Sequence, residues 1–187
     1  MTYGKESGSG LGLYHARTTV ESWGGFLKID STQDVGTRVD IQLPLARAPT
    51  WFVERLTIIA NSKVIVLDDD VSIHRIWEDR LNQANAENAG VKLLHFSTPD
   101  HLLAWTSENR KELTNTVFLI DHELRGFDQV CLSIIQDLGI QSQSILVTSH
   151  FEETTIRARC QNLGVPLIPK CMAGFVPITV EQSVYKQ

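Results

Sequence analysis

The sequence predicts an α/β protein built on a parallel sheet with helices on both faces. Apolar runs of strand length alternate with longer segments in which apolar residues recur at helical spacing. This alternation is typical of strand–helix units, whose crossover connections place successive strands parallel to one another. The five runs occupy residues 64–67, 91–96, 117–120, 145–147 and 165–169.

The segments between these runs carry signals for helix ends. Apolar residues recur at helical spacing over residues 72–82, and we expect Ser72 to be the N-cap of this helix. Thr98 followed by Pro99 pairs a cap residue with a first-turn proline. Two further helices are expected over residues 127–138, before Gly139, and over residues 152–163, before Gly164.

Three consecutive aspartates, Asp68, Asp69 and Asp70, directly follow the first apolar run. Like charges at the end of one strand repel one another, so a positive group must compensate them. A divalent metal is suited to this, since hard cations take oxygen ligands. The alternative is a solvated acidic turn that caps the following helix. Ligands bind at the carboxyl edge of open α/β sheets, and we therefore favour a metal site.

Three of the other runs also end in polar residues. Asp121 follows the third run, Thr148 and Ser149 follow the fourth, and Lys170 follows the fifth. Parallel strands bring all these residues to the same edge of the sheet. With an acid pair, a lone acid, a hydroxyl and a lysine in this order, residues 63–187 resemble a two-component receiver domain.

The resemblance implies a flavodoxin-like (βα)5 fold, doubly wound with strand order 2-1-3-4-5, and a phosphorylation site at its edge. Asp68 and Asp69 would hold Mg²⁺ together with Asp121, which would accept the phosphoryl group as a nucleophile. Lys170 and the metal would offset charge on the phosphoryl oxygens, and Thr148 would hydrogen-bond one of them. The partner implied is a histidine-phosphorylated kinase or phosphotransfer domain.

Three positions depart from the usual receiver pattern. Cys171 follows the lysine where receivers usually have a proline, and Arg125 stands where a proline is common. Leu167 replaces the tyrosine or phenylalanine that often lies three residues before the lysine. These departures leave open a degenerate receiver that is never phosphorylated and acts as a docking module.

A second alternative is an enzyme resembling the haloacid-dehalogenase-type phosphatases. Asp68 would be its nucleophile and Asp70 its second acid, with Thr148 and Lys170 as later motifs. That family also uses a further acid pair near its end, whereas Glu181 is the only acid after Lys170. The two interpretations place a phosphoryl adduct on different residues, Asp121 or Asp68.

The beginning of the chain carries a second pattern. Gly8, Gly10 and Gly12 precede a predicted helix, and glycines at a helix start let backbone N–H groups approach phosphate oxygens. Residues 3–45 resemble the last ATP-binding box and final β-hairpin of a histidine-kinase catalytic domain. The three glycines would be a remnant of its ATP-phosphate loop. The upstream boxes are absent from this sequence, so the resemblance implies ATP only in an intact parent, a hybrid sensor histidine kinase.

The hairpin is expected to bury one face, to which the second strand contributes Thr37, Val39, Ile41 and Leu43. A fragment of this size is too short to bury a core of its own. We therefore expect the apolar segment 48–62, or a second copy of the chain in a homodimer, to cover it. The expected division is a kinase fragment at 1–47, a docked linker at 48–62 and a receiver at 63–187.

The composition argues against several other classes of protein. The net charge is −5 with a pI near 5.6 and no basic cluster, which disfavours nucleic-acid binding. No apolar stretch approaches the roughly 20 residues that span a membrane, so we expect no direct membrane insertion. The three cysteines lack metal-type spacing and fit a reducing, cytoplasmic compartment.

Overall fold

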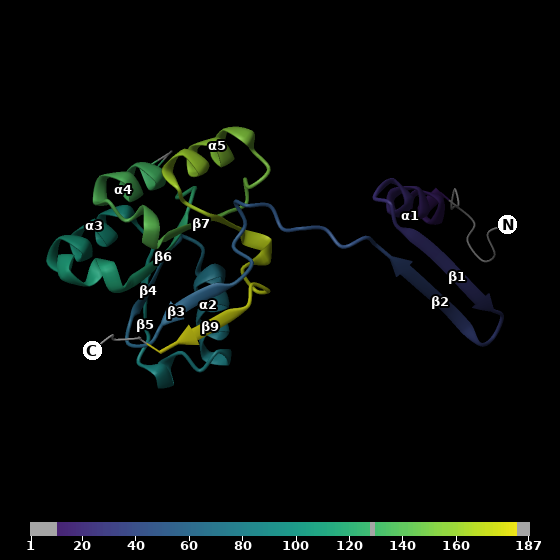
Figure 1. The fold of residues 1–187 in the computed structure, drawn as a ribbon, viewed down its shortest axis with the longest axis horizontal. Coiled ribbons are helices and arrows are strands. Elements are labelled where there is room, and N and C mark those ends of the chain that lie inside the picture. Colours follow the sequence, from purple (N-terminus) through teal and green to yellow (C-terminus); the bar gives the residue numbers. More distant parts are fainter. Residues whose placement is uncertain (1–10, 128–129, 183–187) are drawn as a thin grey trace. The chain divides into compact units, whose positions relative to one another are not determined.

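The computed structural model describes residues 11–127 and 130–182, which form two compact units. The first unit extends to Arg47 and the second begins at Ala48. Figure 1 shows the elements of each unit, and the two are described separately here.

The first unit is a helix followed by a β-hairpin. Helix α1 covers Leu11–Ser22, and strands β1 (Phe26–Thr32) and β2 (Gly36–Gln42) pair antiparallel, with Leu27 opposite Ile41. The helix ends close to the hairpin at Gly25, where a side-chain carbon would lie 2.5 Å from the carbonyl oxygen of Gln42. This close approach requires glycine.

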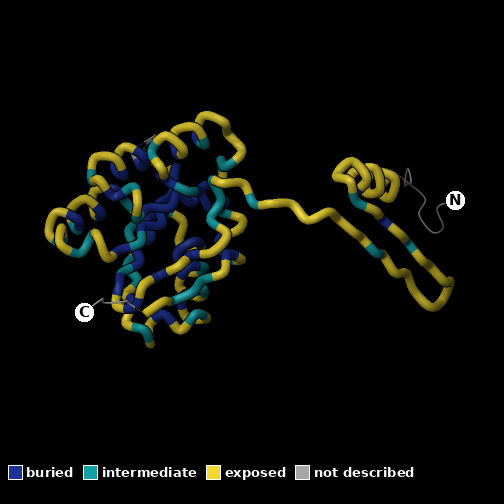
Figure 2. Tube along the Cα trace, viewed as in Figure 1, coloured by how far each residue is buried: buried dark blue, intermediate teal, exposed yellow. Residues whose placement is uncertain are grey.

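The expectation of a buried hairpin face is wrong for the structure of this unit. Val20 and Leu27 are the only buried residues among the described positions 11–47. Val39 and Ile41 are 52% and 58% exposed, as Figure 2 shows for the hairpin as a whole. The physical reason is size, because one helix of 12 residues shields only the part of the hairpin around Leu27.

The second unit contains a five-stranded parallel sheet whose order is β5-β4-β6-β7-β8. In chain order this is 2-1-3-4-5, so the predicted doubly wound, flavodoxin-like α/β fold is confirmed. The central strands are nearly free of solvent exposure because both faces of the sheet are covered. The strands are β4 (Lys63–Leu67), β5 (Lys92–Phe96), β6 (Thr116–Asp121), β7 (Ser144–Thr148) and β8 (Leu167–Pro169).

Helices cover both faces of this sheet. On one face, side chains such as Ile65 and Leu67 pack with residues of α3 (Pro99–Glu108), α4 (Val130–Leu138) and α5 (Thr154–Leu163). On the other face, Val64 and Val66 pack with Ile73, Trp77 and Leu81 of α2 (Val71–Gln83). Short 3-10 helices occupy Glu87–Ala89 (η1), Arg110–Asn115 (η2), Gln141–Gln143 (η3) and Lys170–Met172 (η4).

A two-stranded ribbon covers the rest of the α2 face. Strand β3 (Leu56–Ile59) pairs parallel with β9 (Ile178–Glu181), and Leu56 and Ile58 are buried in the same core as α2. After β8, the described chain thus forms η4 and β9, where a fifth strand–helix unit would place a helix. The β-branched residues Ile178, Thr179 and Val180 favour a strand at this position.

The beginning of the second unit is fixed to the edge of its sheet. The Val53 N–H donates to the Leu167 carbonyl at 3.1 Å, and the Leu167 N–H donates to the Trp51 carbonyl at 2.8 Å. Residues 51–53 thereby extend the sheet beyond β8. Among the described residues, no helix is long and apolar enough to cross a membrane.

Candidate functional site

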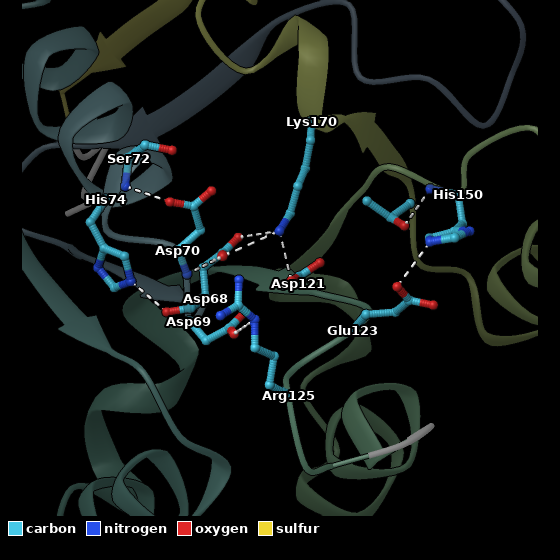
Figure 3. Close-up of polar contacts among 11 residues, drawn as sticks. Asp68, Asp69, Asp70, Ser72, His74, Asp121, Glu123, Arg125, His150 and Lys170 are labelled. Carbon is cyan, nitrogen blue, oxygen red and sulfur yellow. Dashed lines mark hydrogen bonds and ion pairs between the residues drawn. The ribbon is translucent and has the colours of Figure 1, made fainter.

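Three strand ends deliver three charged side chains to one place (Figure 3). Asp68 directly follows β4, Asp121 is the last residue of β6, and Lys170 directly follows β8. The two aspartates are 1% and 2% exposed, so their carboxylates are almost fully removed from bulk water. Burial of charge at this level requires partners within the protein.

Lys170 supplies the positive partner for both aspartates. Its Nζ lies 2.7 Å from Oδ2 of Asp121 and 2.9 Å from Oδ2 of Asp68. Burial lowers the pKa of Lys170, but its hydrogen bonds to Asp121 and Asp68 outweigh burial and raise the pKa overall. The lysine is therefore charged throughout the physiological range and neutralises one of the two carboxylates.

Asp121 has a raised pKa in spite of its ion pair with Lys170. Burial raises the pKa of Asp121 to about 6, and the nearby Asp68 raises it as well, against the lowering effect of Lys170. The carboxylate is thus mostly ionised at pH 7.5 and becomes protonated in mildly acidic solution. The ionised form of this carboxylate is stabilised by any further positive charge that binds beside it.

The aspartates Asp68, Asp69 and Asp121 fit a divalent cation of the hard type. One oxygen from each lies within 4.8 Å of the others. Oδ2 of Asp68 is buried and accepts no hydrogen bond from the described residues, since its 2.9 Å contact with Lys170 lacks hydrogen-bond geometry. An all-oxygen donor set with one unsatisfied buried oxygen suits Mg²⁺.

Asp69 is the most accessible member of the three. It is half-buried, and its Oδ2 lies 3.3 Å from Nε of Arg125, whose side chain is 95% exposed. An exposed pair of this kind contributes little stability and can exchange for another partner. Arg125 therefore lies at the rim of the site without being fixed there.

Asp70 serves the helix and not the cluster of carboxylates. Its side chain accepts a hydrogen bond of 2.8 Å from the Ser72 N–H, and it is the N-cap of α2. The expectation that Ser72 is the cap is therefore wrong, because the helix begins at Val71. The Asp70 N–H donates to Oδ1 of Asp68 at 2.9 Å and so helps to orient that carboxylate.

Thr148 ends strand β7 beside the phosphoacceptor position expected from the sequence. It follows Val147, which is paired with Asp121 in the β6–β7 register, and it is fully buried. Its hydroxyl oxygen accepts a hydrogen bond of 3.0 Å from the His150 N–H. The hydroxyl proton stays available for another acceptor.

His150 connects the loop after β6 with the loop after β7. Its Nε2 lies 2.9 Å from Oε2 of Glu123, and its Nδ1 lies 2.7 Å from Oε1 of Glu153. The hydrogen bond with Glu153 raises the pKa of His150, and Glu123 adds to the effect. No sequence pattern predicts this bridge, because Glu123 is distant from His150 along the chain.

Next to the carboxylates lies a cavity of about 820 Å³, lined among others by Asp69, His122, Arg125 and Arg159. His122 is 7% exposed, and its Nδ1 has no hydrogen-bond partner among the described residues. Burial lowers the pKa of His122, so the imidazole is neutral at pH 7.5. The cavity gives solutes access to the rim of the site.

A pair of histidines lies behind the first aspartate. Nε2 of His74 is 2.6 Å from the carbonyl oxygen of Asp68, and Nδ1 of His74 is 2.7 Å from Nδ1 of His95. Burial and the neighbouring His74 lower the pKa of His95. The two residues are 21 positions apart on different elements, so no local pattern predicts their contact.

The remaining sequence-based expectations concern glycines and the segment around the lysine. Gly8 and Gly10 lie outside the described residues, and Gly12 lies in α1 with open space around it. Leu167 is fully buried, so it is a core residue. The described residues contain no cis peptide bond, and Cys171 lies in η4 in an exposed position.

The chain is 26% identical over 173 residues to the Sensor protein TorS of Escherichia coli (strain K12), which covers 89% of this chain. The chain spans only 18% of the length of that sensor protein.

Two solved structures share part of the arrangement. The receiver domain of Francisella response regulator 1452 is 18% identical, with a TM-score of 0.41 over 59% of this chain and 84% of that one. A pilus assembly-related protein of Burkholderia pseudomallei is 13% identical, with a TM-score of 0.38 over 73% and 84% of the two chains. No family model matches the chain. The fold assignment rests on the strand order of the sheet itself.

Proposed function

We propose that the second unit accepts a phosphoryl group on Asp121, with Mg²⁺ held by Asp68, Asp69 and Asp121. The observation that carries this proposal is the convergence of three carboxylates and Lys170 from three separate strand ends. A cation bound to the acids and the ammonium group would together offset the negative charge of a transferred phosphoryl group. The source of the group would be a phosphohistidine of a kinase or phosphotransfer domain.

Asp121 would act as the nucleophile in this transfer. One of its carboxylate oxygens forms a bond to phosphorus while the bond between phosphorus and the imidazole nitrogen of the donor breaks. The departing imidazole keeps the electron pair of that bond and takes up a proton, and Asp121 becomes an acyl phosphate. Because its pKa is about 6, Asp121 is mostly in the reactive, ionised form at pH 7.5.

Lys170 and Thr148 would contact the phosphoryl oxygens. The ammonium already bonds the reacting carboxylate at 2.7 Å, so a short movement of its flexible side chain reaches a group attached there. The Thr148 hydroxyl can donate its proton, since its oxygen already accepts from His150. Bound Mg²⁺ would supply further positive charge at the same oxygens.

The structure bears on the two alternatives in different ways. A phosphatase of the haloacid-dehalogenase type needs Asp70 as its second acid, yet Asp70 caps α2 through Ser72, which counts against this alternative. The degenerate receiver is consistent with Cys171 and with Leu167, which is buried in the core and carries no aromatic ring. A labelling experiment separates all three.

The test is reaction of the full chain with beryllofluoride or with a small phosphodonor such as acetyl phosphate in 10 mM MgCl₂. We expect an adduct that peptide mapping by mass spectrometry locates on Asp121, and that excess chelator prevents. An adduct on Asp68 would identify the phosphatase alternative. A folded chain that gains no adduct would identify an unphosphorylated docking module.

For the first unit we propose the end of a histidine-kinase ATP-binding domain within a longer parent protein. The sequence similarity to the sensor protein supports this, because it covers 89% of the chain and so leaves only about 21 of 187 residues unmatched. The aligned region therefore reaches into residues 1–47. ATP binding would belong to the complete domain of the parent.

The exposed apolar side chains of the first unit also support a homodimer. Trp23, Phe26, Val39 and Ile41 are each more than half exposed, and apolar surface of this kind is stabilised by a partner. Light scattering should give twice the chain mass of 21.0 kDa at micromolar concentration. A mass of one chain, unchanged by concentration, would contradict the homodimer.

A further inference from the structure

Two imidazoles face one another outside the carboxylate site and have no role in the proposed phosphoryl transfer. His74 lies in the first turn of α2 and His95 near the end of β5, with their ring centroids 4.6 Å apart at an angle of 45°. Their Nδ1 atoms are 2.7 Å apart, so one nitrogen donates and the other accepts. Two imidazole nitrogens this close together can also bind one metal ion when both offer a lone pair.

The surroundings of His74 determine which of its nitrogens is free to bind an ion. Its Nε2 lies 2.6 Å from the Asp68 carbonyl oxygen, which can only accept, so Nε2 must carry the proton. In the neutral ring this leaves the lone pair on Nδ1, directed at His95. A backbone carbonyl that orients the far nitrogen is a common support of metal-binding histidines.

His95 can supply a second lone pair without any change in charge. In the absence of an ion its Nδ1–H donates to His74, and transfer of that proton to Nε2 through solvent gives the other neutral tautomer. The residue is exposed and belongs to β5, the strand at the end of the sheet order. Water and ions therefore reach it directly.

The geometry requires only a small adjustment. Two nitrogens that bind one tetrahedral ion at about 2.0–2.1 Å lie about 3.3 Å apart, compared with 2.7 Å here. Glu78 follows His74 by one helical turn, is exposed, and its charge acts on His95. This negative charge favours a cation beside the histidines, and water can fill the remaining positions around the ion.

We propose that His74 and His95 form a second cation site, which takes a borderline divalent metal such as Zn²⁺ or Ni²⁺, with water completing the coordination. Imidazole ligands suit these ions, whereas the all-oxygen set of Asp68, Asp69 and Asp121 suits Mg²⁺. A metal bound here would link the N-terminal turn of α2 to β5. The site is independent of whether Asp121 is phosphorylated.

The test is a competition titration of the full chain with Zn²⁺ and a chromogenic chelator, in 10 mM MgCl₂ at pH 7.5. We expect one site of micromolar affinity, and His95→Ala should weaken it at least tenfold, because an exposed ligand is removed without disturbing the core. Glu78→Gln should weaken it less than His95→Ala does, because Glu78 acts through its charge and not as a ligand. His101→Ala, a matched change of an exposed histidine on α3, should leave the affinity unchanged.

Two further measurements can overturn the assignment. Zn²⁺ should perturb the imidazole NMR signals of His74 and His95 together, and Asp121→Asn should retain the site. Loss of Zn²⁺ binding in Asp121→Asn would place the ion among the aspartates, and loss in His150→Ala would place it between Glu123 and Glu153. An unchanged affinity in His95→Ala would likewise contradict the proposal.

Discussion

Replacement of Asp121 by asparagine is expected to raise the free energy of unfolding at pH 7.5 by roughly 2 kcal/mol while abolishing acceptance of the phosphoryl group. The pKa of Asp121 is about 6 in the folded protein, compared with 3.8 for an unperturbed aspartate. Ionisation therefore costs more free energy in the folded chain than in the unfolded chain. Asparagine keeps the shape and can still accept from Lys170, but it carries no charge.

The sign of this effect predicts its dependence on pH. Between about pH 4 and pH 6 the folded protein holds the Asp121 proton that the unfolded chain has lost, so the wild-type stability falls as the pH rises through this window. The asparagine variant lacks this contribution. The difference between the two proteins should therefore be clearly smaller at pH 4.5 than at pH 7.5, where it is fully developed.

Urea denaturation at both pH values in the absence of Mg²⁺ measures the difference directly. Asp79→Asn, a change of an exposed aspartate on α2, provides the control and should alter stability by less than about 0.5 kcal/mol at either pH. A loss of stability in Asp121→Asn at pH 7.5 would show that the ion pair with Lys170 outweighs the cost of burial. Addition of Mg²⁺ should stabilise the wild type more than the variant.

The sequence predicts the parallel sheet well for a simple physical reason. A strand covered on both faces must be apolar throughout, and the runs 64–67 and 118–120 are buried along their whole length. Their polar ends then meet at one edge by topology alone. This is why Asp68, Asp121 and Lys170 could be grouped before any distance was known.

Contacts between distant segments are what the sequence does not reveal. The pairing of β3 with β9 joins residues more than 110 positions apart, and neither strand is long enough to be distinctive. The ion pair of Arg125 with Asp69 and the contact of His74 with His95 also join residues of different elements, and no local pattern predicts them. Each depends on how loops and helices pack once the sheet has formed.

For the hairpin of the first unit, the sequence predicts the strand but not its burial. Alternation in residues 37–43 correctly predicts strand β2, but it cannot state whether anything covers the apolar side. Burial depends on which elements cover the strand, and Val20 and Leu27 are the only buried residues among the described positions 11–47. A pattern in one strand therefore predicts its conformation more reliably than its environment.

Replacement of Lys170 by methionine should lower the free energy of unfolding by about 3 kcal/mol at pH 7.5, because it leaves two buried carboxylates without their cation. The loss should be smaller at pH 5, where Asp121 is already largely protonated. Lys63→Met removes the half-exposed ion pair with Glu112 and should cost less than about 1 kcal/mol, which makes it a matched control.

A double-mutant cycle distinguishes this explanation from loss of packing by the lysine side chain. If the cost of Lys170→Met comes from repulsion and uncompensated burial of charge, Asp121→Asn should recover much of it, and the two changes should be strongly non-additive. If the cost comes from packing, the two free-energy changes should simply add within about 0.5 kcal/mol. Additivity would therefore contradict the electrostatic role of Lys170, and with it the argument that this site is built to accumulate negative charge.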